Sequence, residues 1–426
     1  MKGEGKVGII GGGYAGMAAA VTLAEQDISA TVFEAAEVLG GRARRVEYRG
    51  VALDNGLHVL IGAYRETLRL IALVAEGQPP KINRFPFQWR IADRFHLKAI
   101  PLAAPLNLIL GLQSARGASL AEKIRSAQFL ARALRRPLPC DISVSELLSN
   151  VGQNLRQFFW QPLCVAALNT PPEHASARIF LNVLREAFAA RSASDLLVAG
   201  EDLSRLFPER AAAYLARRGA SMQLRNPVAA VRKTAGGFEF EAARGSQAFA
   251  HVICATPPYA VSRLIAGFPE LVEIRRQIDR FEYQPIYSIY LQYPEATKLD
   301  FPMLGMADGP AHWVFDRGAL CGQKGLLAAV ISARGAHEKL SNDDLALRVH
   351  AQLKTLLPDL PLPEWNKVIA EKRATFSCTP ALERPGQMMP LKNFFLAGDY
   401  TASEFPGTIE AAVRSGIRCA RLILGT

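Results

Sequence analysis

The strongest constraint on the fold is a glycine pattern that begins at residue 11. A short apolar run, Val7–Ile10, precedes Gly11-Gly12-Gly13-Tyr14-Ala15-Gly16, and an Ala- and Leu-rich helical pattern follows over Met17–Glu25. A strand, a G-x-G-x-x-G loop and a helix in this order predict a unit whose helix N-terminus faces a dinucleotide phosphate. Gly11 permits the tight turn, Gly13 the approach of the pyrophosphate, and Gly16 the packing of helix on strand. The predicted phosphate contacts are Gly11, Gly13, Tyr14, Ala15 and Gly16.

A carboxylate follows this loop at the spacing expected for ribose recognition. The predicted second strand, Ser29–Phe33, ends at Glu34, about eighteen residues beyond Gly16. A carboxylate there accepts hydrogen bonds from ribose hydroxyls and repels a 2′-phosphate. We therefore predict that Glu34 and the adjacent Ala35 contact the ribose.

Two further motifs indicate which nucleotide is bound. Gly40-Gly41-Arg42 follows the ribose-binding acid, and near the other end Phe394–Ala397 leads into Gly398-Asp399. Together they resemble the FAD motifs of the amine oxidase and carotenoid desaturase superfamily. The resemblance implies that Gly41 and Arg42 lie along the pyrophosphate and that Asp399 binds the ribityl hydroxyls.

The same resemblance assigns three more contacts. The helix opened by Gly407, Thr408 and Ile409 would point its N-terminus at the flavin and stabilise negative charge on the reduced ring. A strand near Val228 would pass the adenine. No cysteine motif near Gly398 suggests a covalent link, so we expect non-covalent FAD.

These motifs predict an α/β protein whose cofactor domain is assembled from separated segments. We expect a Rossmann-like FAD-binding domain of the amine oxidase type from residues 1–71, 201–265 and 386–426. Residues 72–200 and 266–385 are expected to form a second, substrate domain of mixed β-sheet plus helices. Phe281–Tyr293 is expected to be a strand in the sheet that roofs the flavin pocket.

Three stretches narrow the resemblance to one family. They are Leu53–Tyr64, Trp160–Ala177, and Leu396–Ala402 with Ala411–Gly416. The chain resembles, over essentially its whole length, the bacterial hydroxysqualene dehydroxylases, a squalene-associated group of FAD-dependent enzymes in hopanoid biosynthesis. It departs from that family at Leu57, where a glutamine is expected, and in the acidic and aromatic character of Ala402–Pro406.

The family resemblance implies a reductive reaction. Hydroxysqualene would receive a hydride from reduced flavin N5 at an allylic carbon and lose its hydroxyl as water, with an acid assisting, in a dry apolar pocket. The candidates for the acid are His58, Tyr400 and Glu404. Each has an ordinary structural alternative: a histidine bonded to backbone or cofactor, a packing tyrosine and a solvated loop acid.

The loop that carries His58 is itself expected to contact the flavin. Its predicted cofactor contacts are Gly56, Leu57 and His58. Asp54, just before them, is expected to order the loop by capping rather than take part in the chemistry.

Other functions of the same fold stay open. A carotenoid-type desaturase or an amine oxidase would use the same cofactor motifs, and a prenyl-binding escort protein shares the architecture without redox chemistry. The chain holds only one G-x-G-x-x-G, so no second site for a nicotinamide is evident and the electron donor is unknown.

Charge and composition bear on partners. The formal net charge is +11 and the sequence pI is about 9.5, which attracts anions. No Lys/Arg block is interleaved with aromatic residues, which argues against nucleic acid. The excess is mostly arginine spread along the chain, which favours a lipid surface.

An uncharged stretch supports the same partner. Residues 99–112 carry no charge and are flanked by Arg94, His96, Lys98 and Arg116. This stretch is too short to span a bilayer and predicts either a segment that dips into one leaflet or a buried core segment. We expect a protein of the bacterial cytoplasm, associated with the cytoplasmic membrane.

The cysteines suggest neither a metal site nor a disulfide framework. Six of them lie far apart without a C-x-x-C pair. They are expected to be buried small hydrophobes in a reducing compartment.

Overall fold

A five-stranded parallel sheet carries the N-terminal glycine motif in the computed structural model, which describes residues 6–133 and 138–426. Its strand order is β10-β2-β1-β14-β20, and all neighbouring strands are parallel. The strands are β1 (Val7–Ile10), β2 (Ala30–Phe33), β10 (Ser221–Gln223), β14 (His251–Cys254) and β20 (Phe394–Leu396). Because the carboxyl ends of parallel strands meet at one edge, the glycine loop, Glu34 and Gly398-Asp399 all follow strands at the same edge. The predicted α/β fold is confirmed.

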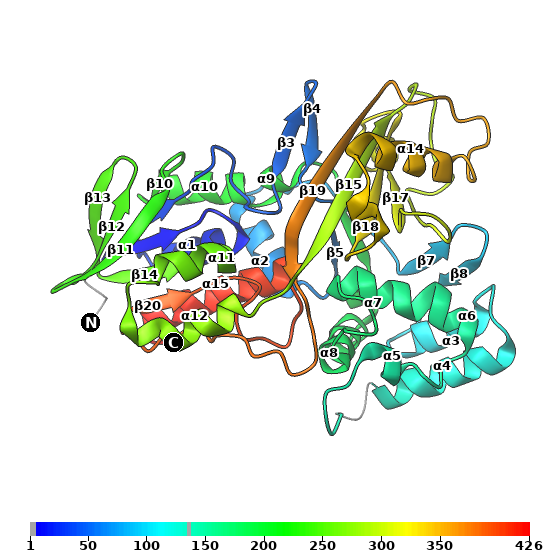
Figure 1. Cartoon of the computed structure of the whole chain (residues 1–426), viewed down its shortest axis with the longest axis horizontal. Helices are drawn as coiled ribbons and strands as arrows, with labels where there is room; N and C mark the ends of the chain where they lie inside the picture. The colour runs from blue at the N-terminus through cyan, green and yellow to red at the C-terminus, as the bar shows by residue number, and fades with distance from the viewer. Residues whose placement is uncertain (1–5, 134–137) are drawn as a thin grey trace.

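Two helices from opposite ends of the chain cover this sheet (Figure 1). Helix α1 (Tyr14–Ala24) is buried along its whole length, and α15 (Ile409–Leu424) packs against it. A Cβ added at Gly416 of α15 would lie 2.1 Å from the Ala15 carbonyl oxygen. The helices therefore touch backbone to backbone, which fixes the middle of α15 against the first turn of α1.

Smaller elements complete this part of the molecule. They are α2 (Arg65–Val74), α9 (Leu203–Leu206), α10 (Pro208–Ala216), α11 (Pro258–Leu264), α12 (Val272–Asp279) and the antiparallel sheet β11 (Val228–Thr234), β12 (Gly237–Ala242) and β13 (Gly245–Phe249). That antiparallel sheet packs on the parallel one through Phe240 and Phe249, whose rings occupy the space above Gly8.

A seven-stranded sheet of order β19-β15-β18-β17-β16-β7-β8 forms the second layer. It is antiparallel except where β16 meets β7. Its strands are β7 (Gln88–Ile91), β8 (Phe95–Lys98), β15 (Tyr283–Gln292), β16 (Met303–Gly305), β17 (Trp313–Asp316), β18 (Leu326–Ser332) and β19 (Trp365–Phe376). The strand predicted over Phe281–Tyr293 is β15. With β19 it forms one edge of this sheet and extends away from the parallel sheet (Figure 1).

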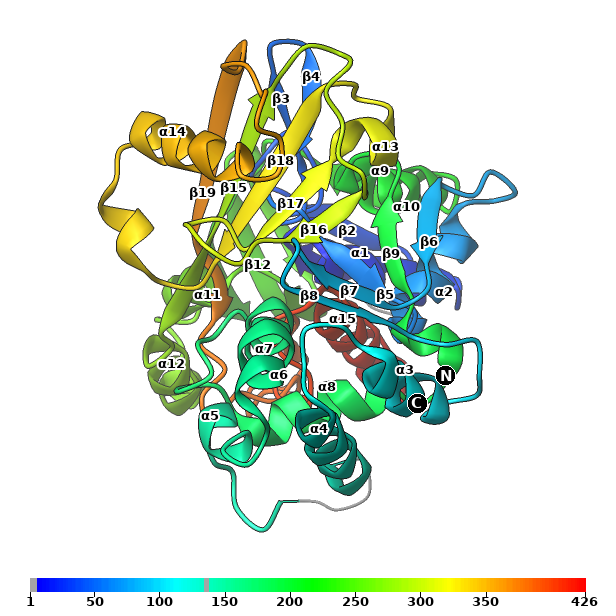
Figure 2. The same ribbon diagram turned by 90° about the vertical axis from the view of Figure 1, so that its right-hand side faces the viewer.

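Two small sheets and a set of helices complete the molecule (Figure 2). The small sheets are the hairpin β3 (Arg45–Tyr48) and β4 (Val51–Asp54), and β5 (Val59–Ile61), β9 (Leu196–Ala199) and β6 (Ile82–Phe85). The helices are α3 (Leu106–Ser114), α4 (Leu120–Ala133), α5 (Val144–Leu147), α6 (Gln153–Leu155), α7 (Gln161–Leu168), α8 (Ala177–Ala187), α13 (Arg317–Cys321) and α14 (Asn342–Leu353). Helices α3 to α8 lie together on the side of β7 and β8, away from the chain termini.

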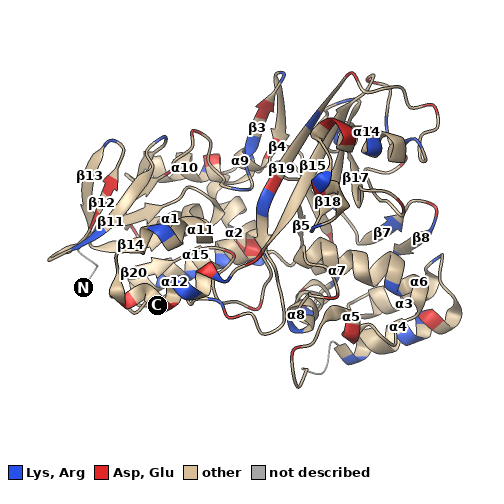
Figure 3. Cartoon of the chain, viewed as in Figure 1, with Lys and Arg blue, Asp and Glu red and all other residues tan. Residues whose placement is uncertain are grey.

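Charged residues are distributed over both parts of the molecule (Figure 3). Among the described residues, no helix combines the length and apolar character needed to cross a membrane. Four cysteines are buried and Cys321 is half-buried, but Cys140 is exposed. The prediction that all six are buried is therefore wrong at Cys140, which lies in the loop before α5.

Candidate functional site

The loop between β1 and α1 forms a backbone cradle. Gly11 has a φ of +109°, and a Cβ there would lie 2.7 Å from the Ala255 carbonyl oxygen. A Cβ at Gly16 would lie 2.0 Å from the Gly11 carbonyl oxygen. Helix α1 begins after Gly13 without a side-chain cap, so no side chain bonds the N–H groups of its first turn. Such a helix end is suited to bind a phosphate.

A second glycine loop faces the first. Gly40 and Gly41 have φ values of +118° and +62°, and Gly40 N donates to Gly12 O at 3.0 Å. A Cβ at Gly13 would lie 3.8 Å from the Cα of Gly41. Two loops without side chains thus face each other, as the passage of a diphosphate between them requires.

The acid predicted for the ribose lies beside this cradle. One carboxylate oxygen of Glu34 accepts from Gly12 N at 2.7 Å and the other accepts from Ala36 N at 2.8 Å. These bonds fix the carboxylate at the end of β2. Ala35 is exposed next to it, and Val228 is half-buried at the start of β11.

The C-terminal motif meets the N-terminal one through an ion pair. The Arg42 guanidinium pairs with the buried carboxylate of Asp399 and also donates to the carbonyl oxygen of Ala374 on β19. A Cβ at Gly407 would lie 3.2 Å from an Asp399 carboxylate oxygen. Thr408 caps α15 by accepting from Ala411 N. Segments from both ends of the chain and from β19 therefore converge at Arg42.

These features fit a flavin nucleotide. Glycines leave the space in the cradle that side chains would fill, and the N-terminus of α1 has no side-chain cap. Glu34 follows β2, and Asp399 follows β20. The predicted residues that would hold the nucleotide here are Gly11, Gly13, Tyr14, Ala15, Gly16, Glu34, Gly41, Arg42, Asp399, Gly407, Thr408 and Ile409.

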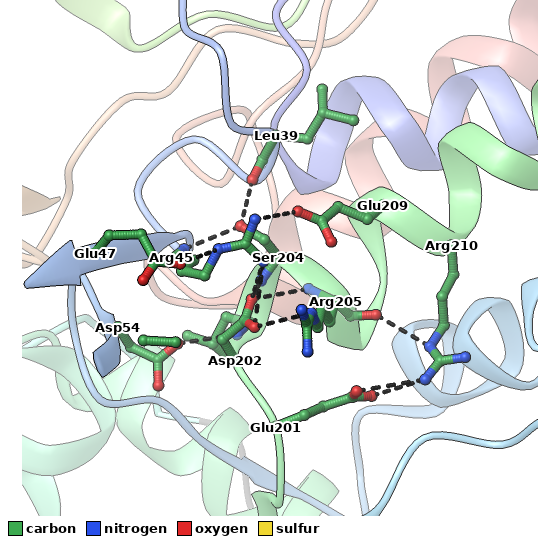
Figure 4. A network of polar contacts seen from close by, with 12 residues as sticks. Leu39, Arg45, Glu47, Asp54, Glu201, Asp202, Ser204, Arg205, Glu209 and Arg210 are labelled. Atoms are coloured by element: carbon green, nitrogen blue, oxygen red, sulfur yellow. Dashed lines mark hydrogen bonds and ion pairs between the residues drawn. The ribbon is translucent and has the colours of Figure 1, made fainter. Parts of the chain in front are cut away.

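The loop with His58 is held by a buried network around Asp54. Figure 4 shows the part of this network that leads to Asp202, Ser204 and Arg45. One Asp54 oxygen accepts from Leu203 N at 2.9 Å, and the other pairs with Arg317 at 3.2 Å. The Tyr290 hydroxyl on β15 donates to the Asp54 carbonyl oxygen at 2.9 Å. Asp54 therefore orders the loop, as expected, and links it to α13 and β15.

The neighbouring hairpin is anchored in the same network. Arg45 on β3 pairs with Asp202 at 3.3 Å and with Glu209 at 3.0 Å. The Ser204 hydroxyl accepts from Arg45 N at 2.9 Å and donates to the Leu39 carbonyl oxygen at 2.7 Å. The second glycine loop is thereby fixed against α9.

His58 is held as a neutral imidazole. Its Nδ1 lies 2.7 Å from the Gly56 carbonyl oxygen, which can only accept, so Nδ1 carries the proton. Nε2, which bonds no residue in the described part of the chain, is an acceptor. Burial lowers the pKa of His58, and the nearby Arg42 charge lowers it further. This geometry suits a residue that orients a partner better than one that donates a proton at neutral pH.

The other two predicted acids lie in different surroundings. Tyr400 is buried next to Gly398 and Phe281, burial raises its pKa, and no described residue bonds its hydroxyl. Glu404 is exposed in the loop before α15, where its carbonyl oxygen accepts from Asn182. Their role as acids stays a prediction.

The structure adds a cluster that the sequence patterns did not identify. The Arg373 guanidinium on β19 lies 4.7 Å from the Tyr259 ring centroid, and the Tyr259 and Tyr283 rings are 6.3 Å apart. Burial raises the pKa of Tyr283, while the charges of Arg373 and Arg42 oppose the rise. This cluster therefore lies within electrostatic reach of the Arg42–Asp399 pair.

A carboxylate on the same strand joins the site. Glu371 accepts a long hydrogen bond of 3.4 Å from the Asn55 side chain, and its charge acts on Arg42. Only the strand Tyr283–Gln292 was predictable from its own alternation. Nothing in the local pattern places β19, and with it Glu371 and Arg373, beside Arg42.

Comparison with known proteins agrees with this site. The model of the family "Flavin containing amine oxidoreductase" matches residues 14–424. The chain belongs to this family. It is therefore a flavin-dependent oxidoreductase, which confirms the predicted class of enzyme and the predicted flavin.

Individual relatives refine the comparison. Hydroxysqualene dehydroxylases from Sinorhizobium fredii and Rhodopseudomonas palustris are 28% and 29% identical, each over 98% of both chains. The zeta-carotene desaturase of Solanum lycopersicum is 26% identical over 98% of this chain and 80% of its own. The resemblance found in the sequence motifs is thereby confirmed.

Solved structures of the same fold are more distant in sequence. Wild-type putrescine oxidase is 18% identical with a TM-score of 0.69, over 99% of both chains. Cyclohexylamine oxidase from Brevibacterium oxydans is 17% identical with a TM-score of 0.69, also over 99% of both. Both support the amine oxidase-type fold of this flavoenzyme.

The Arg42–Asp399 pair generates a stability prediction. Arg42→Gln should lower the free energy of unfolding by about 3–5 kcal/mol because it leaves a buried carboxylate without its counter-charge. Asp399→Asn should recover part of that loss in the double variant, giving a coupling energy of about 1–3 kcal/mol. Urea unfolding of flavin-depleted protein measures all four corners of the cycle.

A matched pair on the surface provides the control. Arg69 and Glu25 are 3.0 Å apart and partly exposed, so the cycle of Arg69→Gln and Glu25→Gln should give a coupling below about 1 kcal/mol. Equal coupling in the two cycles would contradict a special role for Arg42–Asp399.

Proposed function

We propose that this enzyme removes the hydroxyl group of hydroxysqualene by reduction, giving squalene and water, in a bacterial squalene or hopanoid pathway. The observation that carries the proposal is the match to hydroxysqualene dehydroxylases over 98% of both chains. The site described above supports it, because the same chain keeps the cradle, Arg42 and Asp399 that a flavin enzyme needs.

The cofactor we propose is FAD, bound without a covalent link. Glu34 beside a two-glycine cradle suits the ribose and pyrophosphate of an adenine dinucleotide. The segment from Gly398 to Ile409 contains no cysteine, and Cys419 is buried with its thiol directed at the Leu396 carbonyl oxygen. FAD when bound supplies the hydride for the reduction. The reductant that regenerates it is an external donor of unknown identity.

The reaction requires one proton in addition to the hydride. The carbon–oxygen bond of the substrate breaks, the hydride forms the new carbon–hydrogen bond, and the proton joins the departing hydroxide to form water. A group in the chain must therefore carry a proton at neutral pH and release it to oxygen.

We propose the Tyr283 hydroxyl for this step. Its raised pKa keeps it protonated, and it lies on β15 within electrostatic reach of Arg42 and Asp399. His58, with a lowered pKa and a free Nε2, would orient the substrate hydroxyl. Tyr400, without a partner for its hydroxyl, remains the second candidate, and exposed Glu404 the third.

The surroundings of the His58 loop support an apolar substrate. Leu53 and Tyr290 are fully buried in one cluster, and Leu57 and Ile369 pack against it. Leu57 thus places an aliphatic side chain where related enzymes were expected to have a glutamine. A surface of this kind excludes water from an allylic centre.

A desaturase that acts on a long isoprenoid is the second candidate function. It is favoured by the zeta-carotene desaturases among the relatives, and it would run the flavin chemistry in the oxidative direction. An amine oxidase is the third, on fold similarity alone.

One experiment separates these functions. Chemically reduced enzyme is mixed anaerobically with hydroxysqualene, and the flavin absorption and the products are followed. We expect the flavin to reoxidise with formation of one squalene per flavin. Failure to reoxidise, together with bleaching of oxidised enzyme by squalene or by an amine, would instead identify a desaturase or an amine oxidase.

Variants in the same single-turnover assay test the proton donor. Tyr283→Phe should slow flavin reoxidation by about 10²–10⁴-fold, the usual contribution of a general acid, while flavin content stays normal. Glu404→Gln should leave the rate within a few fold. A normal rate in Tyr283→Phe combined with a slow Tyr400→Phe would move the role to Tyr400.

A further inference from the structure

Exposed apolar side chains are concentrated on one corner of the second domain. Of nine large hydrophobic residues exposed in the described part of the chain, five lie between residues 102 and 124. They are Leu102 (43% exposed), Leu106 (53%), Leu110 (41%), Leu120 (67%) and Ile124 (44%). We call these five residues the α3–α4 patch. Their spacing of four residues puts Leu106 and Leu110 on one face of α3, and Leu120 and Ile124 on one face of α4.

Rotation of α3 about its axis cannot bury the patch. The opposite face of this helix holds Leu108 and Leu112 in the core, at 2% and 1% exposure. Gly111 fixes the position, because a Cβ there would lie 2.7 Å from the Lys98 carbonyl oxygen on β8. The uncharged segment at 99–112 is thus core on one side and exposed on the other. The buried-core alternative holds for its inner face, and entry of the segment into a leaflet stays a prediction.

A basic hollow adjoins the patch. A cavity of about 430 Å³ is lined by the side chains of Arg90, Arg94, His96 and Arg116, with Asp93 as the one acid. Gly117 holds the loop against β8, since a Cβ there would lie 2.2 Å from the Arg94 carbonyl oxygen. The loop and strand that carry this hollow also lead directly into α4 and α3.

The cations of this corner are only weakly neutralised. Arg94 lies 3.5 Å from Asp308, but both side chains are mostly exposed. In the part of the chain that the structure describes, no carboxylate pairs with Arg116 or Lys98. Burial lowers the pKa of His96, and the charges of Arg90, Arg116 and Lys98 lower it further, which indicates a local excess of positive charge.

The sequence of this corner has the same bias. Residues 94–133 contain six Lys and Arg and a single acid, Glu122. The Glu122 carboxylate already accepts from Ser119 N at 2.9 Å and Asn154 N at 2.8 Å. An apolar face with a basic margin is therefore the net character of this surface.

We propose that the α3–α4 patch and its basic hollow dock the enzyme onto the surface of an anionic lipid bilayer. The leucines enter the boundary between headgroups and acyl chains, and the arginines contact lipid phosphates. A second copy of the chain fits less well, because two basic margins would meet and repel. The inference takes from the proposed function only that the substrate is a long isoprenoid, which resides in the bilayer.

Flotation of the flavin-loaded full chain with lipid vesicles tests the proposal. We expect binding to vesicles of phosphatidylcholine with phosphatidylglycerol, weaker binding to phosphatidylcholine alone, and release as salt rises. The double variant Leu106→Ser/Leu110→Ser should bind at least about tenfold more weakly. Arg94→Glu/Arg116→Glu should remove the preference for the anionic lipid.

Matched controls come from α14, where Leu347 and Arg348 are also exposed. Leu347→Ser/Arg348→Glu should float like the unaltered enzyme, and all variants should keep their flavin content and unfolding temperature. Free phosphate at equal ionic strength should compete no better than chloride, because the site is a surface for headgroups rather than a pocket for the ion.

Several outcomes would overturn the proposal. They are absence of flotation, equal loss in the α14 controls, or a dimer in sedimentation that the leucine variants convert to monomer. Binding is measured without substrate, and turnover is measured separately on detergent-dispersed hydroxysqualene. Turnover without vesicle binding would therefore reject the docking surface alone, and vesicle binding without turnover would reject the proposed reaction alone.

Discussion

The ion pair between Arg42 and Asp399 is the interaction on which the rest of the site depends. It joins residues 357 positions apart in the chain, and the same guanidinium bonds Ala374 on β19. One side chain thus holds three segments together: the N-terminal cradle, the C-terminal motif and β19. Because the pair is largely buried, removing either charge would lower the free energy of unfolding. The pairing therefore favours this one arrangement of the three segments.

A second buried pair performs the same function for the His58 loop. Asp54 holds Leu203 on one side and Arg317 on the other, so the loop is fixed to α9 and to α13 at once. Tyr290 adds a bond from β15. The two pairs together hold the cofactor loops to β15, β19 and α13. Leu53, Leu57 and Tyr290 pack in one apolar cluster beside Asp54.

The cofactor half of the site could be predicted from sequence because its determinants are local. Gly11, Gly16 and Gly40 are required by backbone conformation or contact within a few residues of chain or across one loop, and strand-end acids such as Glu34 and Asp399 follow directly from their strands. The spacing of apolar residues in α15 likewise predicts which face of the helix is buried. Each of these features depends on residues close together in the sequence, so it can be predicted from the sequence alone.

The residues proposed for the chemical step could not be predicted in the same way. Glu371 and Arg373 reach the site because β19 pairs with β15, a contact between segments far apart in the sequence. Tyr400 and Glu404 are candidates because they flank the helix expected to face the flavin. The direction in which each side chain points depends on packing, and Tyr400 is buried while Glu404 is exposed. The segment 99–112 is similar: its composition fits both core and surface, and only the packing of Gly111 on β8 divides it into two faces.

We propose that both ends of the chain build one site for the whole of FAD. The most direct measurement is equilibrium binding of FAD, FMN and ADP to flavin-depleted enzyme, followed by flavin fluorescence and calorimetry. One FAD should bind per chain, with FMN and ADP each at least about a hundredfold weaker, since each occupies only one of the joined halves. FMN binding as tightly as FAD would contradict the account, because the N-terminal cradle would then contribute nothing to holding the cofactor.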